Sequence, residues 1–352
     1  MIPAGQPTLQ PARPHPVTAT HDWRHAWRDA VRDPHELLAL LGLESLADNL
    51  STTSQFPLRV PRGFIKRMRH GDASDPLLRQ VLPLDAEDHI VPGFDLDAVG
   101  DDEARRGGGV IHKYQGRALL IATGSCAVHC RYCFRRHYPY AEDTAAAAGW
   151  REAVAIIAGD PSLHEVILSG GDPLSLVDHK LAELTDALRR IPHIRRLRIH
   201  TRLPVVLPER VDAGLLAWLR SLPWPVTIVL HANHANEFDA PVDEAIFALR
   251  ATGATVLNQA VLLRGVNDSV DALADLCERG FQAGVLPYYL HQLDRVAGAA
   301  HFEIDDARAV ALHTQLGARL PGYLLPRLVR EVPGAAGKTP LLAAGSSELR
   351  AG

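Results

Sequence analysis

From residue 110 onward, short apolar runs alternate with longer stretches that have helical periodicity. Six runs rich in Val, Ile and Leu are candidate strands, at 117–123, 165–169, 197–200, 226–230, 255–259 and 285–289. Candidate helices are found at 174–190, 209–222, 243–252 and 304–320. Alternation of strand and helix is typical of βαβ units in a parallel sheet. The sequence therefore predicts an α/β fold.

The length of this region limits the number of βαβ units. Roughly 200 residues separate Cys133 from Lys338, and one unit needs about 30 or more residues. About six units fit, whereas a closed barrel of eight units would be crowded. We therefore predict a partial (β/α)6 TIM-like barrel over residues 110–332.

Glycines and polar residues follow the candidate strands. They are Gly170-Gly171-Asp172, Thr201-Arg202, His231 with Asn233-His234, Asn258-Gln259, and His291. The carboxyl ends of the strands meet at one face of a parallel barrel, and that face is where active sites are built. We therefore expect these residues to converge on one pocket.

The segments that flank the barrel are less regular. Residues 1–21 carry Pro, Gln, Thr and Ala without periodicity and are expected to form a disordered tail. Residues 22–109 are expected to form a small helical module and a linker, because apolar residues recur at helical spacing and three glycines end the segment. Residues 333–352 are expected to form a C-terminal loop.

Charge and hydrophobicity indicate which partners and which location are expected for the protein. The 352 residues have a formal net charge of -4 and a pI near 6.5, so there is no basic footprint for nucleic acid. No apolar run reaches the roughly 18 residues of a membrane-spanning helix. The polar, Pro-rich N-terminus also lacks the apolar core of a signal peptide. We expect a cytoplasmic protein that binds neither nucleic acid nor a membrane.

Three of the four cysteines lie within eight residues. Cys126, Cys130 and Cys133 form a C-x3-C-x2-C motif directly after the first predicted barrel strand. Three thiolates on one loop can hold three irons of a [4Fe-4S] cubane and leave the fourth iron open to a substrate or cofactor. A zinc site completed by a nearby histidine is the alternative, although no second Cys or His pair lies close in the sequence.

Lys338 follows a run of glycine and alanine, in the segment Val-Pro-Gly-Ala-Ala-Gly-Lys-Thr-Pro that ends at Pro340. A lysine on such a flexible loop can bring its amine to a cofactor aldehyde and form a Schiff base. On local sequence alone, a solvated loop lysine is the simpler interpretation. A phosphate-binding loop does not fit, because the G-x4-G-K spacing is not met.

Taken together, these motifs resemble a known family. The cysteine motif, followed by Ser-Gly-Gly-Asp-Pro at 169–173, resembles the radical S-adenosylmethionine superfamily, in which the glycine-rich motif (here Gly170, Gly171 and Asp172) binds the cofactor. The Lys338 loop resembles that of the lysine 2,3-aminomutase family, and the similarity extends over roughly residues 58–341. The resemblance implies a [4Fe-4S] cluster on the three cysteines, S-adenosyl-L-methionine on the open iron, and pyridoxal 5'-phosphate on Lys338.

The same resemblance implies an isomerase that converts free L-lysine into β-lysine, and it suggests substrate residues. Arg135 matches the arginine that binds the lysine carboxylate, and a guanidinium fork suits that group. Asp268 and Glu331 match the acidic pair for the side-chain ammonium. Tyr114 and Arg117 are candidates for the pyridoxal phosphate pocket. Without the resemblance, each of these residues would be read as an ordinary surface, turn or strand-flanking residue.

Within the family, Cys-Arg-Tyr-Cys-Phe-Arg-Arg-His and His-Ala-Asn-His-Ala-Asn-Glu resemble the elongation factor P beta-lysylation branch. Ala335 and Ala336 interrupt the poly-glycine loop of the catabolic enzyme, and Glu331 replaces its usual aspartate. The chain also stops soon after Lys338, so the extension tied to zinc and tetramer assembly is not expected. The branch implies (R)-β-lysine for elongation factor P, a functional link to its lysyl-modifying ligase, and an electron donor such as flavodoxin or ferredoxin.

Other functions stay open at this point. A catabolic lysine 2,3-aminomutase is one alternative, although Ala335, Ala336 and Glu331 depart from its pattern. An aminomutase for glutamate is another, and it should lack the acidic pair. A ferredoxin-like carrier would explain three cysteines, but carriers usually supply four and have no use for a barrel or a lysine loop. An interaction protein that only retains the fold should have broken motifs, and here the motifs are intact.

Overall fold

The computed structural model describes residues 22–54, 56–146 and 150–342, and a single nine-stranded sheet organises most of them. The predicted tail at 1–21 and the last part of the predicted C-terminal loop, 343–352, lie outside the described residues. The strands are β1 (Val110–Tyr114), β2 (Arg117–Thr123), β3 (Glu165–Gly170), β4 (Arg196–Thr201), β5 (Val226–His231), β6 (Thr255–Val261), β7 (Leu286–His291), β8 (Arg327–Arg330) and β9 (Thr339–Pro340).

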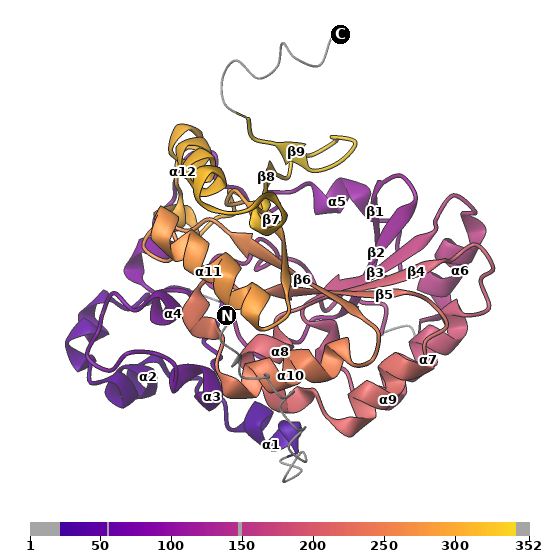
Figure 1. Ribbon diagram of the computed structural model, residues 1–352, viewed down its shortest axis with the longest axis horizontal. Helices are drawn as coiled ribbons and strands as arrows, with labels where there is room; N and C mark the ends of the chain where they lie inside the picture. The colour runs from indigo at the N-terminus through magenta and orange to yellow at the C-terminus, as the bar shows by residue number, and fades with distance from the viewer. Residues whose placement is uncertain (1–21, 55, 147–149, 343–352) are drawn as a thin grey trace, which may run out of the picture.

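The sheet follows chain order from β1 to β9. Strands β2 to β8 are all parallel, while β1 and β9 pair antiparallel at the two edges. One longer helix follows each strand from β2 to β7, and Figure 1 shows these helices around the outside of the curved sheet. They are α6 (Arg151–Gly159), α7 (Asp178–Leu188), α9 (Ala213–Ser221), α10 (Ala240–Arg250), α11 (Val270–Gln282) and α12 (Asp306–Arg319). The predicted partial (β/α)6 barrel is confirmed, with β8 as a seventh parallel strand.

The N-terminal residues form short helices beside the barrel, drawn in indigo in Figure 1. They are α1 (Trp23–Arg28), α2 (Pro34–Leu41), α3 (Arg62–Ile65), α4 (Pro76–Arg79) and α5 (Asp101–Ala104). Their apolar residues, among them Leu37, Phe64 and Leu77, belong to the same core cluster as the barrel strands and helices. One continuous core therefore runs through both parts, and no break in it marks a boundary at Gly109. The division into two domains at this glycine stays a prediction.

Local sequence explains where four of the barrel helices begin. The side chains of Asp212, Asp239, Ser269 and Asp305 each accept a hydrogen bond from a backbone N–H in the first turn of α9, α10, α11 and α12. Such N-caps satisfy donors that have no partner inside the helix.

Among the described residues, no helix is long and apolar enough to cross a membrane.

Candidate active site

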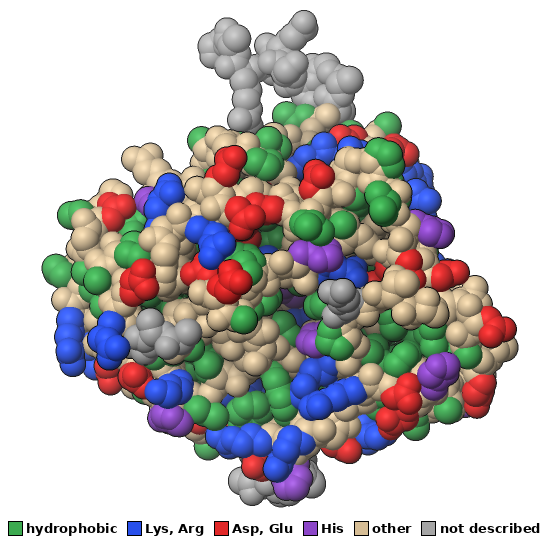
Figure 2. Space-filling view, turned by 180° about the vertical axis from the view of Figure 1, so that it is seen from behind, with side chains coloured by type: hydrophobic (Ala, Val, Ile, Leu, Met, Phe, Trp, Pro, Cys, Tyr) green, Lys and Arg blue, Asp and Glu red, His purple; other side chains and the backbone are tan. Residues whose placement is uncertain are grey.

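A cavity of about 290 Å³ opens at the carboxyl ends of the parallel strands. The predicted convergence is confirmed for residues at or just after the carboxyl ends of β3 to β7, since all of these line the cavity: Gly170, Gly171, Asp172, Thr201, Arg202, His231, Gln259 and His291. It is wrong for Asn233, His234 and Asn258, which lie outside the lining. Figure 2 shows one face of the molecule hollowed near its centre, with His and Lys or Arg side chains around the hollow.

The three clustered cysteines all line this cavity, on the loop that follows β2. Their thiols are free, and burial raises the pKa of Cys133 to about 11, with Cys130 adding to the effect. Arg131, between two of the cysteines, is fully buried and donates from Nε to Oε1 of Glu87 at 2.7 Å. The loop is therefore fixed to the N-terminal residues, and its thiols face the site.

The glycine-rich motif after β3 packs directly against the backbone that leads into the cysteine loop. Gly171 N donates to Thr123 O, and Asp172 N donates to Ser125 O, both at 2.7 Å. Gly170 has a φ of +111°, and a Cβ on Gly171 would lie 2.5 Å from Ser125 O. Only glycine allows so close an approach, so the motif sets the position of the loop that carries the cysteines.

Asp172 holds the neighbouring turns together. Its carboxylate accepts hydrogen bonds from the Thr201 hydroxyl and from the backbone N–H groups of Leu174, Arg202 and Leu203, at 2.7 to 3.1 Å. Both carboxylate oxygens are thus occupied by the protein itself. Asp172 lines the cavity, but its observed contacts join the end of β3 to the end of β4.

Lys338 reaches into the cavity from the glycine-rich loop after β8 and contacts the carboxylate of Glu331. Tyr114 donates its hydroxyl proton to the same carboxylate, and the guanidinium of Arg117 lies 4.6 Å from the centre of the Tyr114 ring. Burial alone would raise the pKa of Glu331, but the charge and hydrogen bond of Lys338 outweigh it, so the pKa lies below its ordinary value. The structure brings these four predicted residues together.

The chain has only four lysines, and two of them line the cavity. Lys113 is held on β1, with Nζ 2.6 Å from Val99 O and 2.7 Å from Oδ1 of Asp101. Lys338 follows two glycines and two alanines, so its backbone is far less restricted than a strand. Of the two, Lys338 is therefore better placed to bind a cofactor covalently.

Arg135 lies in the cavity wall two residues after Cys133 and is 8% exposed. Its Nε donates to Oδ2 of Asp101 at 2.6 Å, and Nη1 donates to the Ser169 hydroxyl at 3.4 Å. Asp101 lies on α5, so a residue from the N-terminal part orients this guanidinium. Arg135 thus lines the cavity with its guanidinium held by Asp101 and Ser169.

The structure corrects the position of Asp268, which does not line the cavity and lies just before α11. The neighbouring Asn267 is the cause. Its buried side chain donates to Asn233 O and Val261 O, both at 2.9 Å, and accepts from Leu263 N at 2.8 Å. These hydrogen bonds fix the loop after β6 with the Asn267 side chain buried. Asp268 is the next residue toward α11 and lies outside the cavity lining.

Asp294 takes the place in the cavity that we expected for Asp268. It follows β7 by three residues, in the run His-Gln-Leu-Asp, and His291 was the last residue of this run that we predicted for the pocket. Burial raises the pKa of Asp294 to about 7, against the opposing charge of Lys338. An acidic residue soon after a barrel strand was the signal that could have found it.

Three histidines add neutral polar groups to the cavity wall. Burial lowers the pKa of His231 to about 3 and lowers those of His200 and His291 well below the usual range. Nε2 of His200 and Nε2 of His291 have no hydrogen-bond partner within the described ranges. Buried polar atoms are normally paired, so these two nitrogens fit a site that receives a polar ligand.

No protein-family model matches the chain. The chain is 48% identical over 323 residues to the L-lysine 2,3-aminomutase of Escherichia coli (strain K12), covering 91% of this chain and 94% of that protein. It is 43% identical over 325 residues to the L-lysine 2,3-aminomutase of Haemophilus influenzae, covering 92% and 96%. The protein of the same name from Acetoanaerobium sticklandii is 34% identical over 328 residues, covering 92% and 78%.

Among solved structures, a radical SAM methyltransferase from Sphaerobacter thermophilus has a TM-score of 0.40 and 21% identity, covering 65% of this chain and 72% of that chain. The aminomutase relatives are far more similar and match almost the whole chain. The chain belongs to the L-lysine 2,3-aminomutase family of radical S-adenosylmethionine enzymes.

Proposed function

We propose that this chain converts L-α-lysine into (R)-β-lysine, and that the product is supplied for β-lysylation of elongation factor P. The observation that carries the substrate assignment is the contact between the Lys338 ammonium and Glu331 inside the cavity. That ammonium is chemically the same group as the side-chain ammonium of free lysine. The cavity thus has an acceptor for the distal end of the substrate.

As a member of its family, the protein is an isomerase that uses a [4Fe-4S] cluster, S-adenosyl-L-methionine and pyridoxal 5'-phosphate. When bound, the cluster and S-adenosylmethionine supply the radical that removes hydrogen from the substrate, and pyridoxal phosphate carries the migrating amino group. Cys126, Cys130 and Cys133 would hold the cluster. Lys338 would hold pyridoxal phosphate, with Tyr114 and Arg117 beside it, and the unpartnered nitrogens of His200 and His291 fit polar groups of the ligands.

Charged groups in the cavity match the two ends of lysine. Arg135 would bind the substrate carboxylate, and Glu331 with Asp294 would bind the side-chain ammonium. Binding at both ends fixes the carbon chain between the cofactors, and such positioning is a large part of catalysis when reacting atoms must meet in one geometry. The acidic pair also argues against glutamate as the substrate, because a distal carboxylate would meet two like charges.

The free cysteines bear on the location of the enzyme, and the cluster bears on its electron donor. The four cysteines are free thiols, which suits a reducing compartment, and we propose a cytoplasmic enzyme. Reduction of the cluster needs one electron from outside the chain, and a flavodoxin or ferredoxin would supply it. The lysyl-modifying ligase of elongation factor P would consume the product. The resemblance of the cysteine-loop and His-Ala-Asn-His segments to the elongation factor P branch supports this last step.

An anaerobic assay tests the proposed function. Protein reconstituted with iron, sulfide and pyridoxal phosphate should convert L-lysine to (R)-β-lysine when given S-adenosylmethionine and dithionite, as read by chiral chromatography. Deletion of the gene should remove the β-lysyl mass increment from elongation factor P, as read by intact mass spectrometry. Turnover of glutamate in place of lysine, or an unchanged elongation factor P, would contradict the proposal.

The pKa of Asp294 predicts how lysine binding depends on pH. Below about 7 this carboxyl is mostly protonated and neutral, whereas the lysine side-chain ammonium stays charged throughout this range. The apparent Kd for lysine should therefore rise as pH falls below 7, by up to about tenfold per pH unit. The cavity histidines stay neutral in this window, because burial lowers their pKa below it.

Calorimetric titration of lysine into the holoenzyme without reductant, between pH 5.5 and 8.5, measures this dependence. Asp294→Asn should abolish the slope, because the group that titrates is gone. A slope that persists in Asp294→Asn would assign the titration to another residue.

A further inference from the structure

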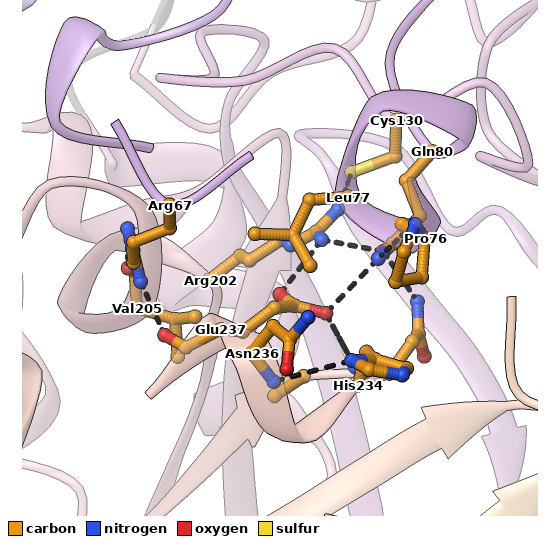
Figure 3. Close-up of polar contacts among 12 residues, drawn as sticks. Arg67, Pro76, Leu77, Gln80, Cys130, Arg202, Val205, His234, Asn236 and Glu237 are labelled. Atoms are coloured by element: carbon orange, nitrogen blue, oxygen red, sulfur yellow. Dashed lines mark hydrogen bonds and ion pairs between the residues drawn. The ribbon is translucent and has the colours of Figure 1, made fainter. Parts of the chain in front are cut away.

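Arg202 is a buried arginine that contacts Cys130 in the loop after β2. It follows β4 and begins the short helix α8 (Leu203–Val206), and it is 5% exposed. Its Nη1 donates to Sγ of Cys130 and to the hydroxyl oxygen of Tyr132, both at 2.8 Å. Figure 3 shows the guanidinium between the sulfur and a group of polar side chains.

Those polar side chains fix the guanidinium in this orientation. Nη2 of Arg202 donates to Oε1 of Gln80 at 2.6 Å and to Oε2 of Glu237 at 2.9 Å, and both acceptors are fully buried. The other Glu237 oxygen accepts from Gln80 Nε2 at 3.1 Å and from the backbone N–H groups of Asn233 and His234 at 2.8 and 3.1 Å. Every partner is therefore itself held, and the arginine is oriented by the N-terminal part and by the end of β5.

The backbone of Arg202 is held as firmly as its side chain. Arg202 N donates to Oδ2 of Asp172 at 2.7 Å, and Nη2 of Arg67 donates to Val205 O in α8 at 2.7 Å. The glycine-rich motif thus fixes both the strand before the cysteines and the arginine that contacts one of them. Such fixed outer contacts are the usual means by which a protein tunes a metal centre.

We infer that Arg202 is a positioning residue that raises the reduction potential of the cluster through its hydrogen bond to Cys130. The inference rests on the proposed binding of the cluster by the three cysteines. Reduction adds one electron from an external donor, and part of the added negative charge resides on the ligand sulfurs. A hydrogen bond and a positive charge at one sulfur stabilise the reduced form, and burial leaves that interaction weakly screened.

The test is a redox titration of the reconstituted full-length protein without S-adenosylmethionine or lysine. Dithionite and mediators set the potential, and the electron paramagnetic resonance signal reports the reduced cluster. In Arg202→Gln we expect the ratio of reduced to oxidised cluster at a fixed potential to fall at least tenfold, which is about 59 mV for a one-electron couple. Arg202→Lys keeps a positive charge but not the planar fork, so the ratio should fall by less.

Arg210→Gln is the matched control. Arg210 is also fully buried and paired with a carboxylate, Asp178, at 2.8 Å, but it does not line the cavity. Its loss should leave the potential at the wild-type value. An unchanged potential in Arg202→Gln with full iron content, or an equal shift in Arg210→Gln, overturns the inference. If Arg202→Gln does not fold, an unchanged potential in Arg202→Lys overturns it.

A separate variant distinguishes this inference from the assignment on which it rests. Cys130→Ala should fail to hold a full cluster, as read by iron content and absorbance. A full cluster in Cys130→Ala would remove the cysteine assignment, and the role of Arg202 with it. A lost cluster in Cys130→Ala, together with an unchanged potential in Arg202→Gln, would leave the proposed function intact and reject only the inference.

Discussion

Replacing Lys338 with alanine should lower β-lysine formation by about 1,000-fold or more, since the variant lacks the residue that binds a whole cofactor. Borohydride reduction of the wild-type enzyme should fix pyridoxal phosphate to one peptide, the one containing Lys338, and the variant should show no such adduct. The cluster should be untouched, because its proposed ligands follow β2 while Lys338 follows β8. The variant should therefore keep its iron chromophore and cleave S-adenosylmethionine without coupling to lysine.

Lys180→Ala is the control for this experiment. Lys180 is exposed and pairs with Glu183 at 2.8 Å on the surface of α7, so its loss should leave turnover unchanged. Peptide mapping that found the reduced cofactor on Lys66, Lys113 or Lys180, or normal turnover in Lys338→Ala, would reject the assignment of Lys338.

Replacing Asp294 with asparagine should weaken lysine binding far more than S-adenosylmethionine binding. An ammonium that loses a charged partner inside the cavity costs about 3 kcal/mol, which corresponds to an increase of roughly 100-fold in the apparent Kd for lysine. The Kd for S-adenosylmethionine should change little, because Asp294 is assigned to the distal end of the amino acid. Calorimetry with each ligand separately measures both constants.

Asp268→Asn is the matched control, because it makes the same chemical change outside the cavity. We expect its lysine affinity to stay within about twofold of the wild type, in the range of ordinary surface substitutions. If Asp268→Asn weakened lysine binding and Asp294→Asn did not, the assignment of the lysine ammonium to Asp294 would be wrong. Equal weakening of both ligands in Asp294→Asn would show that Asp294 does not bind the side chain.

The fold was predictable where local signals were strong. The strand predicted at 117–123 coincides with β2, and the other five predicted strands match within one or two residues at each end, because runs of Val, Ile and Leu with polar ends are typical of buried parallel strands. Strand β8 was missed, since Arg327–Arg330 is only four residues long and has just two apolar residues between its two arginines. Helix α6 was also missed.

By itself, the sequence determined which chemistry the protein carries. The cysteine spacing is a local pattern that indicates a metal centre, whereas the lysine in its Gly/Ala loop was assigned a cofactor only through the combination of motifs that resembles a known family. The relatives agree with that result, because their similarity extends over nearly the whole chain.

Only the tertiary structure decided which side chains meet. Asp268 and Asp294 both follow barrel strands, and the choice between them depended on Asn267, whose side chain turns inward and closes its loop. Arg202 and Cys130 are 72 residues apart in the sequence. Asp172 bonds to both segments, since it accepts from Arg202 N and donates from its own N–H to Ser125 O, next to the cysteine loop. The direction of a side chain after a strand depends on which groups pair with the backbone N–H and C=O of its loop. Those partners are often residues far away along the chain, so the local sequence does not reveal them.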